Sequence, residues 1–434
     1  MSSPRTEDDN ANDMVASSDS ERENEDLALL KLVLRKLNVN DQTLLHRHVG
    51  QIPDALHMLW RLQHPRLNFE FMQRKLRRSD LELFLQEMIR DIPSIKFRSE
   101  HLQEELNILE RANIGRLLHV KCCAITWDNS PSKTKTKFPL WPFLALPRLM
   151  SNLTDLAIYC PVQDCFIDQF GKLEALTIAG EISTPAMEAI YLSGAPLKTL
   201  DLPGPHTYPI RGISHCKHLC NLLVHLDTFF AGQSEILQLP RLAELRITEI
   251  QANKDITKAL SNVVQEKCNE LVGIKIDCSF ADHAKFLSKL ALDRCMNLTA
   301  LELSNCIFEY QDMAELCFPV GITYAQFANC PDLTDEQLLD FIKANTKLEE
   351  LILDQCPELT QNLLHGVLKV RSSGTKQVSL LLSVGRSPDL WDSYQQNLNY
   401  WARKESILKM ESVQSHDLDD IVMNFEITKD FPEN

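Results

Sequence analysis

Apolar residues recur with a fixed spacing along the C-terminal three quarters of the chain. Residues 298–306 carry Leu at the first, fourth and sixth positions and Cys at the ninth, and residues 348–356 repeat this order. Residues 322–330 form a weaker copy with Ile, Ala, Phe and Cys. Because side chains alternate between the two faces of a strand, the fourth and sixth positions share one face. The pattern therefore predicts a short, half-buried strand in each copy.

This spacing is that of a leucine-rich repeat, a unit that packs only on its neighbours. The segments between the strands contain helical patterns, such as residues 335–342. Packed helices need about 8–10 Å between their axes, whereas strands lie about 4.8 Å apart, so the stack has to curve. The sequence predicts an α/β fold, a leucine-rich-repeat solenoid in the form of a curved horseshoe. Parallel strands should line its concave face and helices its convex face.

The repeats also set the expected domain boundaries. We expect a leucine-rich-repeat domain over residues 113–388 and a capping helix over residues 389–412, because an open end would expose core. A weaker first copy begins at Leu117, with Val120 and Cys122 at the strand positions. The later copies begin at Leu153, Leu173, Leu197, Leu219, Leu242, Leu271, Leu298, Ile322, Leu348 and Thr375.

The N-terminal part of the chain has a helical period instead. Apolar residues recur at helical spacing through residues 29–37, and residues 38–41 then offer a turn and an N-cap. We expect a small all-α module over residues 27–67 and a helical linker over residues 68–112. The basic run at residues 74–78 is read as a solvated helix face, with a nuclear address as the alternative.

Charge is concentrated at the two ends of the chain. The net charge is −15, but residues 1–26 hold nine acidic and two basic residues, and residues 413–434 hold six acidic and one basic residue. Both segments are expected to be acidic tails, the first of them disordered. The remainder is nearly neutral, so nucleic acid is not expected as a partner. Long apolar runs are absent from the sequence, which argues against a membrane partner.

Two features of the sequence resemble a known family. The runs around Cys330 and Cys356 resemble the cysteine-containing class of leucine-rich repeats, which in animals occurs mainly in F-box proteins. Residues 29–41 resemble a divergent F-box, with Val33, Leu34, Leu37 and Asp41 at matching positions; Val49 and Trp60 lie near the later Val and Trp of the family pattern. The Leu-Pro pair that opens the family motif is replaced by residues 26–28, Asp-Leu-Ala.

The resemblance implies a non-catalytic substrate receptor of an SCF-type cullin ubiquitin ligase. The helical module would bind the Skp adaptor, and the horseshoe would hold a target protein for ubiquitin-dependent degradation. The adaptor-binding residues that it implies are Leu29, Leu30, Val33, Leu34, Leu37 and Asp41. The alternative is an interaction scaffold without a ligase, which the missing Leu-Pro pair favours.

The residues expected to bind the target come from the strand pattern. Outward positions of consecutive repeats should lie side by side on the concave face. A mixed polar face with a tyrosine suits a protein partner. The predicted target-binding residues are Glu244, Arg246, Lys275, Asp277, Glu302, Tyr324, Gln326, Glu350, Ile352 and Asp354.

No catalytic or cofactor motif stands out in the sequence. Walker, GxGxxG and GxSxG patterns are absent. The densest group of potential metal ligands spans residues 206–225, but it has no paired CxxC and lies across a repeat strand. We therefore expect no enzymatic activity, no cofactor and no metal.

The cellular compartment is indicated only broadly. The first ten residues are polar and acidic, unlike a secretory signal peptide, and the 13 cysteines are then expected to be thiols in a reducing compartment. This predicts the cytoplasm, with the nucleus as the alternative.

Overall fold

The computed structural model describes most of the chain. The described residues are 36–48, 60, 66–89, 92–127, 141–162, 166–250, 254–278, 289–308, 313, 316, 321–372 and 379–412. The chain divides into two compact units, Met1–Ile182 and Ser183–Asn434. We describe each unit by itself.

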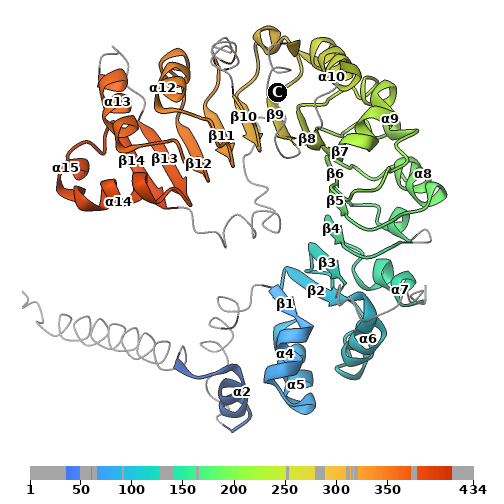
Figure 1. Ribbon diagram of the computed structural model, residues 1–434. Coiled ribbons are helices and arrows are strands. Elements are labelled where there is room, and N and C mark those ends of the chain that lie inside the picture. The colour runs from blue at the N-terminus through green and yellow to red at the C-terminus, as the bar shows by residue number, and fades with distance from the viewer. Residues whose placement is uncertain are drawn as a thin grey trace, which may run out of the picture. The chain divides into compact units, whose positions relative to one another are not determined.

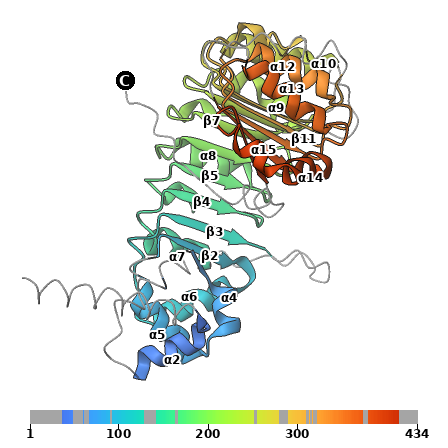
Figure 2. The ribbon, with the colours of Figure 1, turned by 90° about the vertical axis from the view of Figure 1, so that its left-hand side faces the viewer.

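Among its described residues, unit 1 contains five parallel strands that follow one another in sequence order (Figures 1 and 2). They are β1 (Arg66–Asn68), β2 (Ser94–Arg98), β3 (Cys122–Thr126), β4 (Asp155–Ile158) and β5 (Ala175–Ile178). The helices between them are α4 (Phe69–Lys75), α5 (Arg78–Met88), α6 (Leu102–Arg111) and α7 (Trp141–Leu149), with 3₁₀ turns at Ser99–His101 and Ile167–Gln169.

The helix α2 (Val39–His48) packs against α5. The buried Trp60 connects the two, because its indole Nε1 donates to Gln42 Oε1 at 2.8 Å and its ring meets Phe84 edge-on at 4.9 Å. Arg47 of α2 also pairs with the buried Asp80 of α5. The end of the predicted helical module is therefore held against the first repeats.

The sheet begins earlier than the sequence analysis expected. Strand β2 lies inside the predicted helical linker, residues 68–112, and pairs with both β1 and β3. Ile92, Ile95 and Phe97 are buried with the one-four-six spacing of a repeat, so this segment is a repeat and not a linker. The weak copy at Leu117 is also shifted: Cys123 and Ile125 are the inward residues of β3, which places its frame at Val120.

The part of unit 2 that the structure describes contains nine parallel strands in sequence order. They are β6 (Thr199–Leu202), β7 (Asn221–His225), β8 (Glu244–Ile250), β9 (Gly273–Cys278), β10 (Ala300–Ser304), β11 (Tyr324–Ala328), β12 (Glu350–Asp354), β13 (Leu380–Gly385) and β14 (Leu408–Ser412). Its helices are α8 (Thr184–Leu192), α9 (Leu226–Ile236), α10 (Lys254–Lys267), α12 (Asp335–Ala344), α13 (Gln361–Ser372), α14 (Pro388–Gln396) and α15 (Leu398–Ala402), with 3₁₀ turns at Ile213–His215 and Leu292–Arg294.

The helices of unit 2 lie on one side of its strands. In Figure 1, α8, α9, α10, α12 and α13 all flank the convex side, so strands line the concave side in the part of the unit that the structure describes. The repeat positions Leu298, Leu301 and Leu303 are completely buried. The predicted α/β leucine-rich-repeat solenoid is confirmed.

A ladder of residues with left-handed backbone closes four neighbouring strands. Asn305, Asn329, Gln355 and Arg386 follow β10, β11, β12 and β13, with φ between 42° and 57°. The amide of Asn329 donates to Asn305 Oδ1, and Asn305 Nδ2 donates to Asp277 Oδ1 at 2.6 Å. Cys306, Cys330 and Cys356 come next and are fully buried, as thiols that fill the turn.

The C-terminal end differs from the expected single capping helix over residues 389–412. Two short helices, α14 and α15, are followed by the edge strand β14, which pairs with β13. Thr375, the first residue of the last predicted repeat, lies outside the described residues. The register pairs Leu351 with Leu382 and Leu353 with Val384, so the last repeat begins at Ser379, four residues after Thr375.

Candidate functional site

Strand register aligns one row of outward side chains across the concave face of unit 2. Consecutive members are direct neighbours in the sheet, and all are at least partly accessible. The row, which we call the central row, is Asp201, Leu223, Arg246, Lys275, Glu302, Gln326 and Ile352. A second row beside it contains Glu244, Gly273, Ala300, Tyr324 and Glu350.

The charged members of the two rows are paired with one another. Lys275 Nζ lies 2.8 Å from Glu302 Oε2, and Arg246 donates to Glu244 Oε2 at 3.0 Å. These are the two cations of the rows, so the remaining carboxylates, Asp201 and Glu350, leave the surface with net negative charge.

The tyrosine lies among these carboxylates. The hydroxyl of Tyr324 donates to Gln326 Oε1 at 3.0 Å. Burial raises the pKa of Tyr324, and the charges of Glu302 and Glu350 raise it further. The phenol therefore stays protonated, and it presents a polar atom at the edge of an aromatic surface.

Burial also shifts the titration of the carboxyl at the start of the central row. It raises the pKa of Asp201 to about 6, against the opposing attraction of Arg246 and Lys275. For Arg246, burial favours the neutral form, but Glu302, Glu244 and Asp201 outweigh it and raise the pKa of the guanidinium. The charge of this surface consequently changes between mildly acidic and neutral pH.

Eight of the ten predicted target-binding residues lie in the two rows. The other two, Asp277 and Asp354, are held in the turn ladder. Asp354 is only 3% exposed and receives Arg386 Nε at 3.1 Å and a terminal nitrogen of the same guanidinium at 2.6 Å. Both aspartates are therefore engaged in closing their strands.

Asp201 and Leu223 are members of the central row that the sequence analysis did not select. Both occupy the fifth position of their repeats, which begin at Leu197 and Leu219. The rule that identified Arg246 and Lys275 would have found them.

Two of the six predicted adaptor-binding residues, Leu37 and Asp41, lie in the described part of the chain. Leu29, Leu30, Val33 and Leu34 lie outside the described residues. Leu37 is half-buried, and Asp41 is exposed and bonded locally, with its carboxylate accepting from Asn38 Nδ2 at 2.6 Å.

The suspected metal ligands between residues 206 and 225 are bonded separately. His225 Nδ1 accepts from the Asp227 N–H at 3.2 Å, His215 Nδ1 donates to the Gly212 carbonyl at 2.9 Å, and Cys220 Sγ donates to the His218 carbonyl. In the described ranges, no three His, Cys, Asp or Glu side chains are grouped as a metal site would require.

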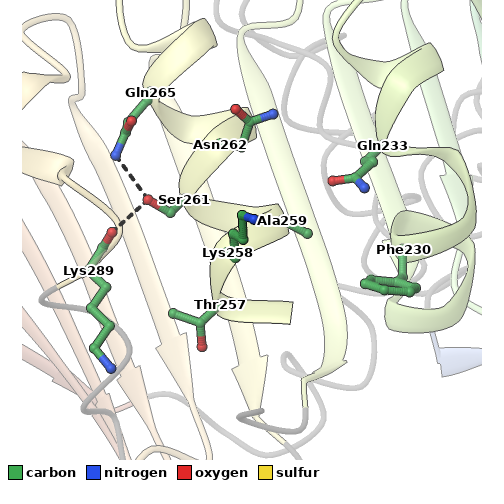
Figure 3. Close-up of a pocket in the computed structure, with 9 residues that line it drawn as sticks. All are labelled: Phe230, Gln233, Thr257, Lys258, Ala259, Ser261, Asn262, Gln265 and Lys289. Carbon is green, nitrogen blue, oxygen red and sulfur yellow. Dashed lines mark hydrogen bonds between the residues drawn. The ribbon is translucent and has the colours of Figure 1, made fainter. Parts of the chain in front are cut away.

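A shallow groove of about 760 Å³ lies on the convex side, over α9 and α10 (Figure 3). Gln265 Nε2 donates to Ser261 Oγ at 3.0 Å, and that hydroxyl donates to the Lys289 carbonyl at 2.7 Å. The described residues that line it are Phe230, Gln233, Thr257, Lys258, Ala259, Ser261, Asn262, Gln265 and Lys289. They include no carboxylate, imidazole or thiol.

Comparison with known proteins gives distant structural likenesses only. No protein-family model and no curated protein matches the chain. Solved structures that resemble it include yeast Rad7 in complex with Elc1, with 13% identity and a TM-score of 0.46 over 92% of this chain and 91% of that one. Another is an internalin, InlF, from Listeria monocytogenes, with 12% identity and a TM-score of 0.36 over 76% and 81% of the two chains.

Within the described ranges, no helix combines the length and the apolar character needed to cross a bilayer.

Proposed function

We propose that this chain is the non-catalytic substrate-recognition subunit of an SCF-type cullin ubiquitin ligase. The concave face of unit 2 would hold a target protein, and the N-terminal helical module would hold the Skp adaptor, so that the target is ubiquitylated and degraded. The observation that carries the proposed target binding is the register of the strands, which brings the central row and Tyr324 onto one accessible face. The adaptor half is supported by the F-box resemblance of residues 29–41.

The chemistry of the concave face supports a protein target. It combines a tyrosine, an arginine and two partly accessible apolar side chains, Leu223 and Ile352, which are residue types that contribute to protein interfaces. Its two cations, Arg246 and Lys275, are already paired with carboxylates, so a partner meets side chains that are held in place and an excess of negative charge from Asp201 and Glu350.

The packing of α2 supports an adaptor surface on its opposite side. Val39, Gln42 and Thr43 are buried toward α5, whereas Leu44 is 38% exposed and Leu45 is half-buried. Asp41 precedes these leucines by three and four residues within α2, so it shares their side of the helix, whereas the half-buried Leu37 lies just before α2 begins at Val39.

Affinity capture from cells tests the ligase assignment. We expect a cullin and the Skp adaptor to co-purify with the intact chain. Leu34→Asp combined with Leu37→Asp should abolish their capture, and Leu118→Asp, at an exposed leucine of unit 1 (44% exposed), should not. Absence of both proteins at normal expression would contradict the assignment.

The alternative is an interaction scaffold without a ligase, which the missing Leu-Pro pair favours. Variants of the concave face separate the two. Arg246→Glu should weaken capture of the target by about tenfold or more, as for an interface anchor, while cullin capture persists. Arg241→Glu, at an exposed neighbouring arginine, is the matched control. A target captured without cullin would favour the scaffold.

A further inference from the structure

Aromatic side chains gather on the C-terminal cap of unit 2. Trp391 and Tyr394 of α14 lie 5.8 Å apart with near-parallel rings, and Tyr394 stacks on Trp401 of α15 at 6.0 Å. Tyr400 meets Trp401 edge-on at 5.0 Å, and His365 of α13 lies 5.5 Å from the same indole. We call these five side chains the aromatic platform.

Much of the platform is open to solvent. Tyr400 is 45% exposed and the adjacent Leu398 is 46% exposed, His365 is also exposed, and Trp391 and Tyr394 are half-buried. Trp401 alone among the five is buried. A contiguous apolar surface of this kind marks an interaction site, and Trp and Tyr are the residue types that most often anchor one.

We propose that residues 413–434 of this same chain, the acidic tail, bind the aromatic platform. The described chain ends at Ser412, the last residue of β14, and β14 begins six residues after α15 ends at Ala402. An extended chain spans about 3.3 Å per residue, so Phe425, thirteen residues beyond Ser412, reaches up to about 40 Å. The platform is within that range.

The composition of the acidic tail complements the platform and its surroundings. It carries Met423, Phe425 and Phe431, which can pack on aromatic rings, and its net charge is −5. Beside the platform, Arg403 is exposed and has no ion-pair partner in the part of the chain that the structure describes. Apolar side chains can therefore pack on the rings while carboxylates meet the guanidinium.

Because the acidic tail belongs to the same chain as the platform, even a weak intrinsic affinity would keep the platform largely occupied. A short flexible connection gives an effective concentration in the millimolar range, so an intrinsic Kd of about 0.1 mM would leave the platform about 90% occupied.

Nitration of Tyr400 by tetranitromethane, followed by mass spectrometry of the purified chain, tests the proposal. We expect Tyr400 to react about tenfold faster when the chain is shortened to end at Ser412. Added peptide 413–434 should restore its protection, and a scrambled peptide should not. Tyr159 of unit 1 is the internal reference and should react equally in all samples.

A full-length variant controls for the effects of misfolding in the shortened chain. Phe425→Ala combined with Phe431→Ala should expose Tyr400 to the same extent as the truncation. Equal nitration of Tyr400 in the intact and altered chains would overturn the proposal. So would protection that appears only as protein concentration rises, since that indicates a second copy of the chain. These outcomes do not depend on any ligase component.

Discussion

At the scale of single residues, the concave face contains carboxyls whose ionisation depends on their neighbours. Asp201 is the clearest case, because burial raises its pKa to about 6 while Arg246 and Lys275 oppose the shift. A raised pKa means that the folded protein holds the proton more tightly than the unfolded chain does. The ionised form of Asp201 therefore costs stability, and this cost grows as pH rises from about 4 to about 6.

Asp201→Asn should remove that cost. Relative to the natural chain, we expect the variant to gain stability as pH rises through this window, to keep the gain above pH 6 and to show none below pH 4. Urea unfolding across the pH range measures the difference. Asp332→Asn, at an exposed aspartate, is the control. A difference that does not vary with pH would contradict the assigned pKa.

At the scale of the elements, the turn ladder determines how the strands of unit 2 end. Asn329 has a φ of 51°, its N–H donates to the Asp354 carbonyl at 2.7 Å, and its side chain donates to Asn305. Asn329 thus adopts the left-handed backbone that the turn requires, and its side chain links its own repeat to the preceding one. Asparagine suits this position because it tolerates left-handed backbone better than most residues.

Two substitutions at Asn329 separate these contributions. Asn329→Gly keeps the backbone conformation and loses the side-chain bond, which should cost about 1 kcal/mol. Asn329→Ala loses the same bond and also places an alanine Cβ at positive φ, which should lower the stability by about 1 kcal/mol more. Chemical unfolding of both variants gives the two values. Equal losses would show that the left-handed backbone carries no cost at this position.

At the scale of the whole molecule, stability in a repeat protein is transmitted between neighbours. Leu301→Ala removes a fully buried side chain from β10 and should cost about 2–5 kcal/mol. Amide hydrogen exchange should accelerate in β9, β10 and β11, and amides of β2 and β3 in unit 1 should be unaffected. Uniform acceleration through both units would mean that the chain unfolds as one cooperative body.

The repeat pattern could be read from the sequence because its cause is local. Each strand buries its own fourth and sixth positions, as at Leu301 and Leu303, so the period alone reveals the repeat and its outward residues. The same reasoning places Arg246, Lys275 and Glu302 side by side. It missed β2, with Ile95 and Phe97 at the fourth and sixth positions, because the helical period of the neighbouring residues was extended over this short strand.

Contacts between distant parts of the chain are what the sequence could not supply. Asp354 was expected to face a partner, but Arg386, 32 residues later, turns back onto it. Trp60 joins α2 to α5 by bonding to Gln42 and packing on Phe84, and no local sequence pattern predicts these contacts. The platform likewise assembles only when α13, α14 and α15 meet.

By itself, the sequence determined the class of fold, the period of the strands and the side of each strand that faces outward, because these follow from alternation and burial within one repeat. Only the tertiary structure decided which outward charges neutralise each other, which carboxylates close a turn and where aromatic rings gather. Those outcomes depend on distances between side chains that lie tens of residues apart in the chain.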